Sequence, residues 1–223
     1  MNKKAVLTKD LFNCDIPHLK DFFDKYQYPW EMLPHIKELI KDLLNKGILG
    51  YKLLKEDVLV GENVSIAETA TIIGPAIIGN NTEIRPGCFI RGNFICGDNC
   101  VLGNSSEFQK AILLYHVQAP HYNYVGDSIL GNYAHMGAGS ICSNLKSDGN
   151  NVVIHADIEI ETGLRKIGAF VGDHSEVGCQ SVLNPGTIVG PGSQIYPLTS
   201  VRGIVPSNSI YKAKDNIVIK ERR

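Results

Sequence analysis

A repeat of six residues runs through most of this chain of 223 residues and limits its fold more than any other feature. Steps of six from Val60 meet an apolar residue or a cysteine every time as far as Phe108, and steps from Val171 do so as far as Val201. Small or β-branched residues stand four places after most of these positions, with Phe94 as the exception. A helix would show spacings of three and four and a simple strand a spacing of two, so neither explains the period alone.

The period of six predicts a short strand followed by a corner, repeated along a parallel β-helix. The apolar residue of each hexad then points into a narrow interior, and the small residue four places on fits near the next corner. Glycine and pairs such as Asn80-Asn81 and Asp98-Asn99 suit the corners because they tolerate positive φ. Three hexads for each coil give a triangular prism. A sandwich with regular strands would instead need segments of about 8–12 residues.

Composition excludes several classes of protein. The net charge of -1 gives no sign of a nucleic-acid partner, since a duplex binder carries a basic patch or stripe. No run approaches the roughly 18 apolar residues of a membrane span, and the N-terminus lacks the apolar run of a signal peptide. None of the 6 cysteines forms a C-x-x-C pair, which argues against structural zinc. We therefore expect a cytoplasmic protein with no membrane partner.

The segment 15–46 has the pattern of helices rather than of the repeat. Asp15, just before Ile16-Pro17, is a candidate helix start, and Gly47 is a candidate C-cap. One face carries an apolar stripe made of Leu33, Ile36, Ile40, Leu43 and Leu44. This stripe predicts a cap over the open end of the β-helix, which would otherwise expose backbone edges. A helix that binds a partner is the alternative.

The hexad pattern resembles the left-handed β-helix of hexapeptide-repeat acyltransferases, and the left hand is taken from that resemblance. The resemblance implies a mainly β fold, a left-handed parallel β-helix with a short N-terminal helical region. The expected division of the chain is an N-terminal helical cap region at 1–56, the β-helix domain at 57–205 and a C-terminal tail at 206–223.

The period is interrupted twice, and chemistry is expected at the interruptions because loops carry function on a repetitive scaffold. The first interruption covers residues 107–127, EFQKAILLYHVQAPHYNYVGD. The second is the polar segment 143–153, SNLKSDGNNVV, which follows MGAGSIC.

The stretch APHYNYVGDSILGNYAHMGAGSICSN resembles the acetyltransferase domain of the bifunctional glucosamine-1-phosphate acetyltransferase/UDP-N-acetylglucosamine pyrophosphorylase family. That family has a histidine, a tyrosine three places later, Gly-Asp, and a GAG segment followed by an asparagine. The matching residues here are His121, Tyr124, Gly126-Asp127, Gly137-Ala138-Gly139 and Asn144. Upstream, IRPG matches the arginine that grips the sugar phosphate, and EFQKA corresponds to Glu-x-Lys-Lys-Ala.

The resemblance implies an acyl-CoA-dependent acyltransferase, with acetyl-CoA as co-substrate and an amino sugar phosphate or a nucleotide-linked sugar as acceptor. No metal is expected, and three-fold assembly into a homotrimer is implied. His121 would be the catalytic base. The implied acceptor contacts are Arg85, Tyr124, Asn144, Lys110 and His135. The implied acyl-CoA contacts are Gly137, Ala138, Gly139, Asp173 and Lys212.

These residue types suit acyl transfer. An imidazole can accept the proton of a nucleophile at neutral pH. Backbone N–H groups can stabilise the charge that develops on a thioester carbonyl, and the unbulky GAG backbone lets CoA lie close. The guanidinium of Arg85 could bind a phosphate or carboxylate with two hydrogen bonds. The plainer interpretation of His121 is a loop histidine bonded to a neighbouring carbonyl.

Several positions differ from the family pattern. Gln109 stands where the family has an acceptor-binding lysine, and His135 stands where it has an asparagine. Pro197 and Asp173 replace an alanine and a serine at the CoA end. These differences leave the identity of the acceptor open. The 55 or so residues before the repeat hold no Gly-rich nucleotide loop, so no nucleotidyltransferase half is expected in this chain.

Two other functions remain open. His116 and His121 form an H-x4-H pair that resembles the γ-class carbonic anhydrases, which use such a pair for zinc, and IRGNF comes near their RGD stretch. Three protein ligands and a water are typical of catalytic zinc, and only two ligands are visible here. The other alternative is a non-catalytic β-helix, related to sugar-1-phosphate nucleotidyltransferases and kept for trimerisation or regulation.

Overall fold

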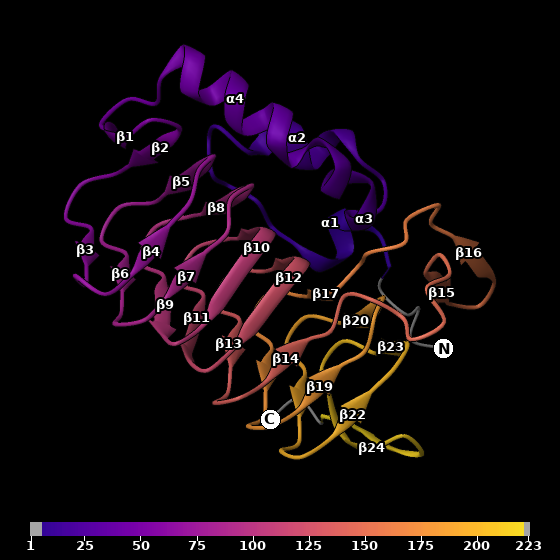
Figure 1. Ribbon diagram of the computed structural model, residues 1–223. Coiled ribbons are helices and arrows are strands. Elements are labelled where there is room, and N and C mark those ends of the chain that lie inside the picture. Colours follow the sequence, from indigo (N-terminus) through magenta and orange to yellow (C-terminus); the bar gives the residue numbers. More distant parts are fainter. Residues whose placement is uncertain (1–5, 221–223) are drawn as a thin grey trace.

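Three faces of stacked short strands form a prism in the computed structural model, which describes residues 6–220 (Figure 1). Face 1 consists of β2 (Val58–Val60), β5 (Ala76–Ile78), β8 (Phe94–Cys96), the ends of β10 (Glu107–Leu113) and β12 (Tyr124–Leu130), β17 (Ala169–Val171), β20 (Thr187–Val189) and β23 (Ile204–Val205). Face 2 consists of β3 (Ser65–Ile66), β6 (Glu83–Ile84), β9 (Val101–Asn104), β11 (Gln118–His121), β13 (His135–Met136), β18 (Glu176–Val177), β21 (Gln194–Ile195) and β24 (Ser209–Ala213). Face 3 consists of β4 (Thr71–Ile72), β7 (Phe89–Ile90), the beginnings of β10 and β12, β14 (Ile141–Cys142), β19 (Val182–Leu183) and β22 (Ser200–Val201).

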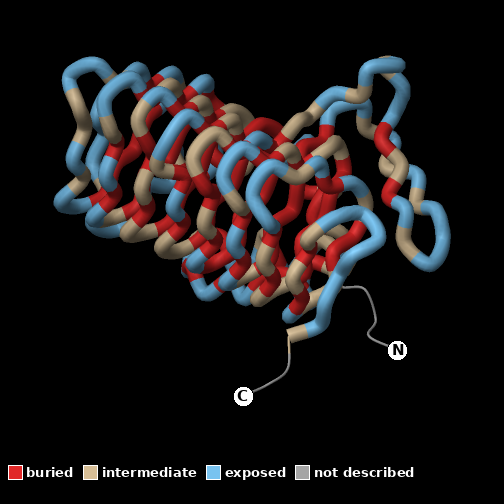
Figure 2. Tube along the Cα trace, turned by 90° about the horizontal axis from the view of Figure 1, so that it is seen from below, coloured by how far each residue is buried: buried red, intermediate tan, exposed pale blue. Residues whose placement is uncertain are grey.

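All strand pairs within the three faces are parallel, and the predicted left-handed parallel β-helix is confirmed. The interior holds the apolar residues that recur every six places, from Val60 through Phe108 and again from Val171 through Val201. Figure 2 shows the same alternation along the coils, with buried segments between exposed corners. The period of six thus reports one inward residue for each face.

The chain turns at three corners in every coil, here called the first corner (between faces 1 and 2), the second corner (faces 2 and 3) and the third corner (faces 3 and 1). Left-handed residues mark the first corner in successive coils: Asn63, Asn81, Asn99, His116, Tyr133 and His174, with φ between 54° and 60°. Equivalent corner residues stack one above another, because successive strands of a parallel sheet lie about 4.8 Å apart. Side chains far apart in sequence therefore meet along a corner.

The first predicted interruption is not a loop. Ala76 pairs with Phe94, 18 residues on, but Phe94 pairs with Ala111 and Ala111 with Ser128, 17 residues on in each case. The residue lost belongs to the third corner, where β10 and β12 run from face 3 into face 1. The six-residue repeat therefore loses its phase, although the prism continues through residues 107–127.

The second interruption is a true excursion, and it is longer than the predicted 143–153. Ile129 pairs with Phe170, so the third corner is extended from residue 143 to residue 168. This segment contains the antiparallel hairpin of β15 (Val153–His155) and β16 (Glu159–Glu161), which stands away from the prism (Figure 1). Val152, Ile154 and Ile167 are buried and anchor its base.

The helices are α1 (Thr8–Leu11), α2 (Lys20–Lys25), α3 (Pro29–Met32), η1 (Leu33–His35) and α4 (Ile36–Lys46), and α4 ends at the predicted cap Gly47. Asp15 does not start a helix, because α2 begins only at Lys20. The predicted position over the open end of the prism is wrong. The helices lie along the outside of face 1 (Figure 1), where they share one apolar core with Leu59, Ile77, Ile95, Ile112, Ile129, Phe170, Ile188 and Ile204.

Each of those eight residues directly precedes an inward residue of face 1, and they point outward from the prism. Faces 2 and 3 carry mainly polar or exposed residues at their outward positions, such as Glu83, Glu107 and Glu176. A row of outward apolar side chains requires a cover, since its burial removes apolar area from water. The helical region supplies that cover.

Antiparallel strands stand at both ends of the prism. At the N-terminal end, β1 (Lys52–Lys55) pairs with β2. At the C-terminal end β24 completes face 2, so the prism extends past residue 205, and β25 (Asn216–Ile219) pairs with β24. Each hairpin covers the edge of one face, face 1 at the N-terminal end and face 2 at the C-terminal end.

Candidate active site on the second and third corners

His121 lies on the second corner, next to the GAG segment of the following coil. The Gly139 N–H donates a hydrogen bond to the His121 carbonyl oxygen at 3.0 Å, which fixes the two coils in register. The His121 side chain is exposed, and among residues 6–220 none forms a hydrogen bond with its ring. The imidazole is therefore available to a molecule that lies along this corner.

The glycines of GAG have a packing reason of their own. A Cβ on Gly137 would lie 2.6 Å from the backbone nitrogen of Cys179 in the next coil, and Gly139 has φ of 70°. Both positions therefore need glycine for the coils to stack. The result is a stretch of backbone without bulky side chains beside His121.

Tyr124 and Asn144 meet at the other side of face 3 in a network with Asp127. The Asn144 Nδ2 amide donates to the Tyr124 hydroxyl at 3.1 Å and to the Asp127 carboxylate at 2.6 Å. Lys110 reaches the same carboxylate, with Nζ 3.5 Å from Oδ1. The structure thus brings together three of the residues predicted to contact the acceptor, around a carboxylate that was not among them.

Gly126 allows Tyr124 to take this position. A Cβ on Gly126 would lie 2.4 Å from the Tyr124 hydroxyl oxygen. The phenol ring lies back over its own strand and presents the hydroxyl to Asn144. The Gly-Asp pair after the tyrosine therefore has two separate tasks, space at Gly126 and hydrogen bonding at Asp127.

Burial raises the pKa of Asp127, and the hydrogen bond from Asn144 and the Lys110 ammonium partly oppose that rise. Burial also raises the pKa of Tyr124, with the Asp127 charge next in importance. The Asp127 side chain is only 4% exposed, so it acts through its neighbours rather than on a bound molecule. Both amide hydrogens of Asn144 point to Asp127 and Tyr124, which leaves its Oδ1 as a free acceptor.

Arg85 is not at this network. It stands at the start of the second corner, two coils before Pro120, so the two residues are about 10 Å apart along the prism axis. The Arg85 guanidinium pairs with the Glu83 carboxylate at 3.1 Å. Arg91 is the arginine close to Tyr124. Its guanidinium pairs with Glu107 at 2.6 Å, and its charge partly opposes the rise that burial causes in the pKa of the Tyr124 hydroxyl. Arg91 belongs to IRGNF, the segment that resembles the RGD stretch of the γ-class carbonic anhydrases.

Comparison with known proteins adds an independent line of evidence. The family described as GMPPB C-terminal domain matches residues 72–162. The chain is 30% identical to the bifunctional protein GlmU of Methanococcus aeolicus over 86% of this chain and 55% of that protein. It is also 30% identical to a bifunctional sugar-1-phosphate nucleotidylyltransferase/acetyltransferase of Sulfurisphaera tokodaii, over 82% of this chain and 47% of that protein. The chain is a relative of the GlmU proteins.

The resemblance predicted from the motifs is thereby confirmed. The chain spans about half the length of the GlmU proteins that it matches. Among solved structures, a mutant of AntD, an N-acyltransferase from Bacillus cereus in complex with dTDP-4-amino-4,6-dideoxyglucose and coenzyme A, is 21% identical. Its TM-score is 0.43, over 82% of this chain and 89% of that one.

His135, Lys212 and Asp173, which were also predicted on the GlmU pattern, lie away from the Asn144 network. His135 lies on the outside of face 2, where its Nδ1 is 3.2 Å from the Gln118 amide oxygen. The Lys212 ammonium lies 5.6 Å from the centre of the Tyr196 ring, on the second corner three coils beyond His121. Lys212 therefore lies on the same corner as the GAG segment. Within one chain, His135 lies on neither the second nor the third corner.

Asp173 has a structural role within the chain, and its predicted contact with CoA stays a prediction. Its carboxylate accepts hydrogen bonds from the backbone N–H of Asn13 at 2.8 Å and of Asn132 at 2.7 Å. One carboxylate oxygen thus holds the N-terminal segment at Asn13, and the other holds the first corner of the preceding coil at Asn132. Burial raises the pKa of Asp173, and these two N–H groups oppose the rise.

His116 lies on the first corner, in a stack of rings. Its ring lies 4.6 Å from that of Tyr133, which in turn lies 5.0 Å from that of His174. On its other side His116 Nε2 is 3.4 Å from the Asn99 amide. His116 and His121 stand on different corners, and within residues 6–220 no group of three or more His, Cys, Asp or Glu could hold a metal ion.

The surface of the second corner is open in the single chain. The cavities of about 600, 510 and 640 Å³ are lined by the N-terminal helical region and the first corner, and none includes His121. None of the helices described between residues 6 and 220 is long and apolar enough to cross a membrane.

Proposed function

We propose that this chain is an acyl-CoA-dependent acyltransferase, with acetyl-CoA as co-substrate and an amino sugar phosphate or a nucleotide-linked amino sugar as acceptor. The proposal rests on how His121 and the Tyr124–Asn144–Asp127 network are arranged. An exposed, unbonded imidazole stands beside a glycine-rich corner, and a preorganised Tyr124–Asn144–Asp127 network lies across the same face. The names of the GlmU relatives, which include an acetyltransferase, support it.

In the proposed reaction His121 removes a proton from the acceptor amine as its nitrogen attacks the thioester carbonyl. The new nitrogen–carbon bond forms, the carbon–sulfur bond breaks, and the CoA thiolate leaves and recovers the proton from the imidazolium. A backbone N–H of the second corner would stabilise the oxyanion. General base catalysis of this kind contributes about 10²–10⁴ in rate.

The acceptor would be oriented by two complementary groups. Asn144 donates to the Tyr124 hydroxyl, so the hydroxyl proton of Tyr124 remains available for donation. The free Oδ1 of Asn144 can accept a hydrogen bond from an amine or a hydroxyl. Arg91 uses one of its donors on Glu107 and has others left for an anionic group, such as a phosphate.

A homotrimer is part of this proposal, because the second corner is open in one chain and a second prism would turn it into a groove. Cyclic assembly around a three-fold axis is a closed symmetry. Light scattering should give about three times 24.5 kDa. A clean monomer would contradict a site shared between neighbouring prisms.

The test is acetyl-CoA binding by isothermal titration, followed by an assay of CoA release with glucosamine 1-phosphate and with nucleotide-linked amino sugars. Chromatographic detection of CoA is preferred, since the exposed Cys179 would react with a thiol reagent. Binding with turnover supports the acyltransferase. Absence of acetyl-CoA binding would favour the non-catalytic β-helix, which the replacements at Gln109 and His135 keep open. Stoichiometric zinc in the purified protein would favour the zinc enzyme.

A further inference from the structure

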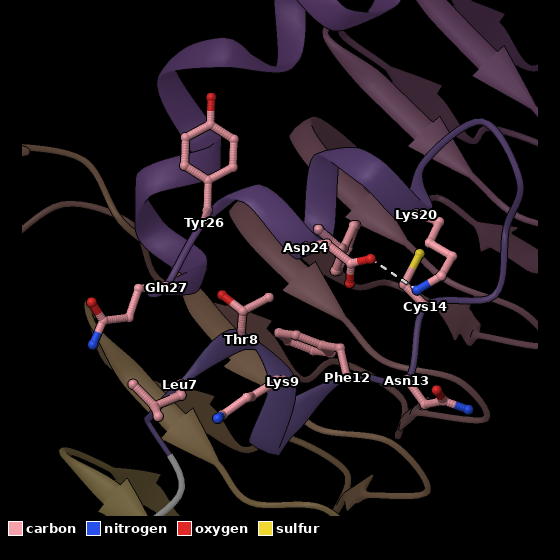
Figure 3. Close-up of a pocket in the computed structure, with 11 residues that line it drawn as sticks. Leu7, Thr8, Lys9, Phe12, Asn13, Cys14, Lys20, Asp24, Tyr26 and Gln27 are labelled. Atoms are coloured by element: carbon pink, nitrogen blue, oxygen red, sulfur yellow. Dashed lines mark hydrogen bonds and ion pairs between the residues drawn. The ribbon is translucent and has the colours of Figure 1, made fainter.

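A cavity of about 600 Å³ lies within the N-terminal helical region, away from both corners of the candidate active site. It is enclosed by α1, the segment that follows it, and α2 with the two residues beyond its end (Figure 3). Its volume is in the range of small-molecule sites, about 300–1,000 Å³. No residue that lines it belongs to the second or third corner.

The inner wall of the cavity is apolar and uncharged. Phe12 and Phe23 meet edge to face, with ring centres 5.9 Å apart and planes at 87°. Both side chains are buried. Burial raises the pKa of the Cys14 thiol to about 12, so this group is neutral under physiological conditions. An aromatic or other flat apolar body fits against such a wall.

Thr8 supplies a buried polar group with no partner. The residue is 3% exposed and lines the cavity, and among residues 6–220 nothing forms a hydrogen bond with its Oγ1. Its backbone groups are used, because its N–H donates to the Gln27 carbonyl and its carbonyl accepts from Phe12. Figure 3 shows Thr8 in the middle of the labelled side chains. A buried hydroxyl without a partner is rare. Its oxygen has almost no accessible surface in the free protein, so a ligand atom would satisfy it after a rotation of the Thr8 side chain toward the cavity.

The rim of the cavity has a positive balance. Lys9 and Lys20 both line it, with Asp24 as the one carboxylate. Lys20 pairs with Asp24 at 2.9 Å, and both side chains are more than half exposed, so a ligand anion can compete for this ammonium. The Lys9 ammonium points away from Asp24 in Figure 3. An anionic group on the ligand is therefore favoured at the rim.

The cavity wall is held in place by the prism. The Asn13 N–H donates to Asp173 at 2.8 Å, and its carbonyl accepts from the Asn132 amide at 2.7 Å. Asp173 also donates its own N–H to the Leu11 carbonyl at 3.0 Å. These bonds fix the chain on either side of Phe12, so the cavity exists before any ligand arrives.

We propose that this cavity is a binding site for a small organic anion with an aromatic body. The aromatic part lies on Phe12 and Phe23, a polar atom engages the Thr8 hydroxyl, and a carboxylate, sulfonate or phosphate lies at the lysine rim. The proposal does not depend on acyl transfer, because it uses none of the residues assigned to that reaction.

The probe is 1-anilinonaphthalene-8-sulfonate, which has an aromatic body and one anionic group. Its fluorescence titration with the full chain should show one saturable site. In a Lys9→Glu/Lys20→Glu double variant the affinity should fall about tenfold, because attraction at the rim becomes repulsion. The matched control is Lys37→Glu/Lys41→Glu, two exposed lysines of α4 that do not line the cavity, and its affinity should stay within twofold.

A second variant, Thr8→Val, keeps the shape of the side chain and removes only the hydroxyl. It should melt at the wild-type temperature or above, since the unpartnered group is lost, and it should bind the probe a few-fold more weakly. Equal affinity in all four proteins, or an equal loss in the α4 control, would overturn the proposal. Thermal melting of each variant separates loss of the site from loss of the fold.

Discussion

The first and second corners carry two histidines only five residues apart, and the prism gives them opposite surroundings. His116 is stacked on Tyr133 and lies beside the Asn99 amide. His121 is exposed beside a run of glycine and alanine, with no hydrogen bond to its ring from residues 6–220. Both residues lie at corners: His116 is itself left-handed, with φ of 57°, and His121 precedes the left-handed Tyr122. Their surroundings differ because different side chains stack along each corner.

The comparison shows how a solenoid separates structure from chemistry. Along the first corner, planar and amide side chains satisfy one another from coil to coil, and Asp173 adds an anchor for the N-terminal segment. Along the second corner, small residues leave one imidazole unsatisfied. A residue with no partner in its own chain is available to a substrate.

The largest expected effect is the loss of catalysis in His121→Ala. Removal of a general base should lower kcat for acetyl transfer at least 100-fold. The melting temperature should not change, because the side chain is exposed. Steady-state kinetics with acetyl-CoA, together with a thermal melt, measure both.

The matched control is His116→Ala on the first corner. It should keep kcat within about twofold and lower the free energy of unfolding by about 1 kcal/mol, through loss of the ring stack. Equal loss of activity in the two variants would end the distinction between the corners and reopen the zinc hypothesis.

Asp173→Ala should destabilise the first corner without affecting acetyl-CoA. Two backbone N–H groups lose a charged acceptor, which predicts a loss of about 2 kcal/mol in the free energy of unfolding. Denaturant titration measures this value. A rise in the KM for acetyl-CoA with unchanged stability would instead support the CoA contact predicted from the sequence.

Arg91→Ala and Arg85→Ala test which arginine serves the acceptor. Loss of one charge-assisted hydrogen bond of about 1.5 kcal/mol should raise the acceptor KM roughly tenfold in Arg91→Ala. Arg85→Ala should leave it within twofold, because Arg85 pairs with Glu83 on another corner. The reverse order would return the role to the arginine of IRPG.

The smallest effect concerns pH and Asp127. Burial raises its pKa in the folded protein above the ordinary value, so the folded state binds the proton more tightly than the unfolded state. The stabilisation from this group is present below the ordinary pKa of aspartate and is lost as pH rises through the folded pKa. Wild type should therefore gain stability relative to Asp127→Asn as pH falls from 7 toward 4.

Guanidinium unfolding of both proteins at several pH values measures that difference, and other titrating groups cancel because the two proteins share them. A difference that stays constant over this range, or that moves in the opposite direction, would contradict a raised pKa at Asp127.

Much of the fold could be predicted from the sequence because the prism repeats one local rule. The inward residues recur every six places, so Val60, Ile78 and Cys96 could be placed in the core without coordinates. The outward row on face 1 was also visible, since Leu59, Ile77 and Ile95 precede these residues by one place. The six-residue period carries no information about what covers this row, so the predicted position of the helices over the open end is wrong.

The candidate site was only partly predictable. The motif identified Tyr124, Asn144 and Lys110, and the structure brings them together. It did not identify Asp127 as their common partner, although the Gly-Asp pair was part of the motif. The match to IRPG predicts Arg85 as the acceptor arginine, and this stays a prediction, because a short match cannot show which coil faces Tyr124.

The sequence by itself determined the coil, because inward and outward positions in a parallel β-helix follow from spacing within each hexad. Only the tertiary structure decided which side chains stack along each corner. Those contacts join residues about 17, 18 or 41 places apart, according to whether the third corner is short, regular or extended by the excursion. Function at these corners depends on contacts between coils, and a period within the coil carries no information about them.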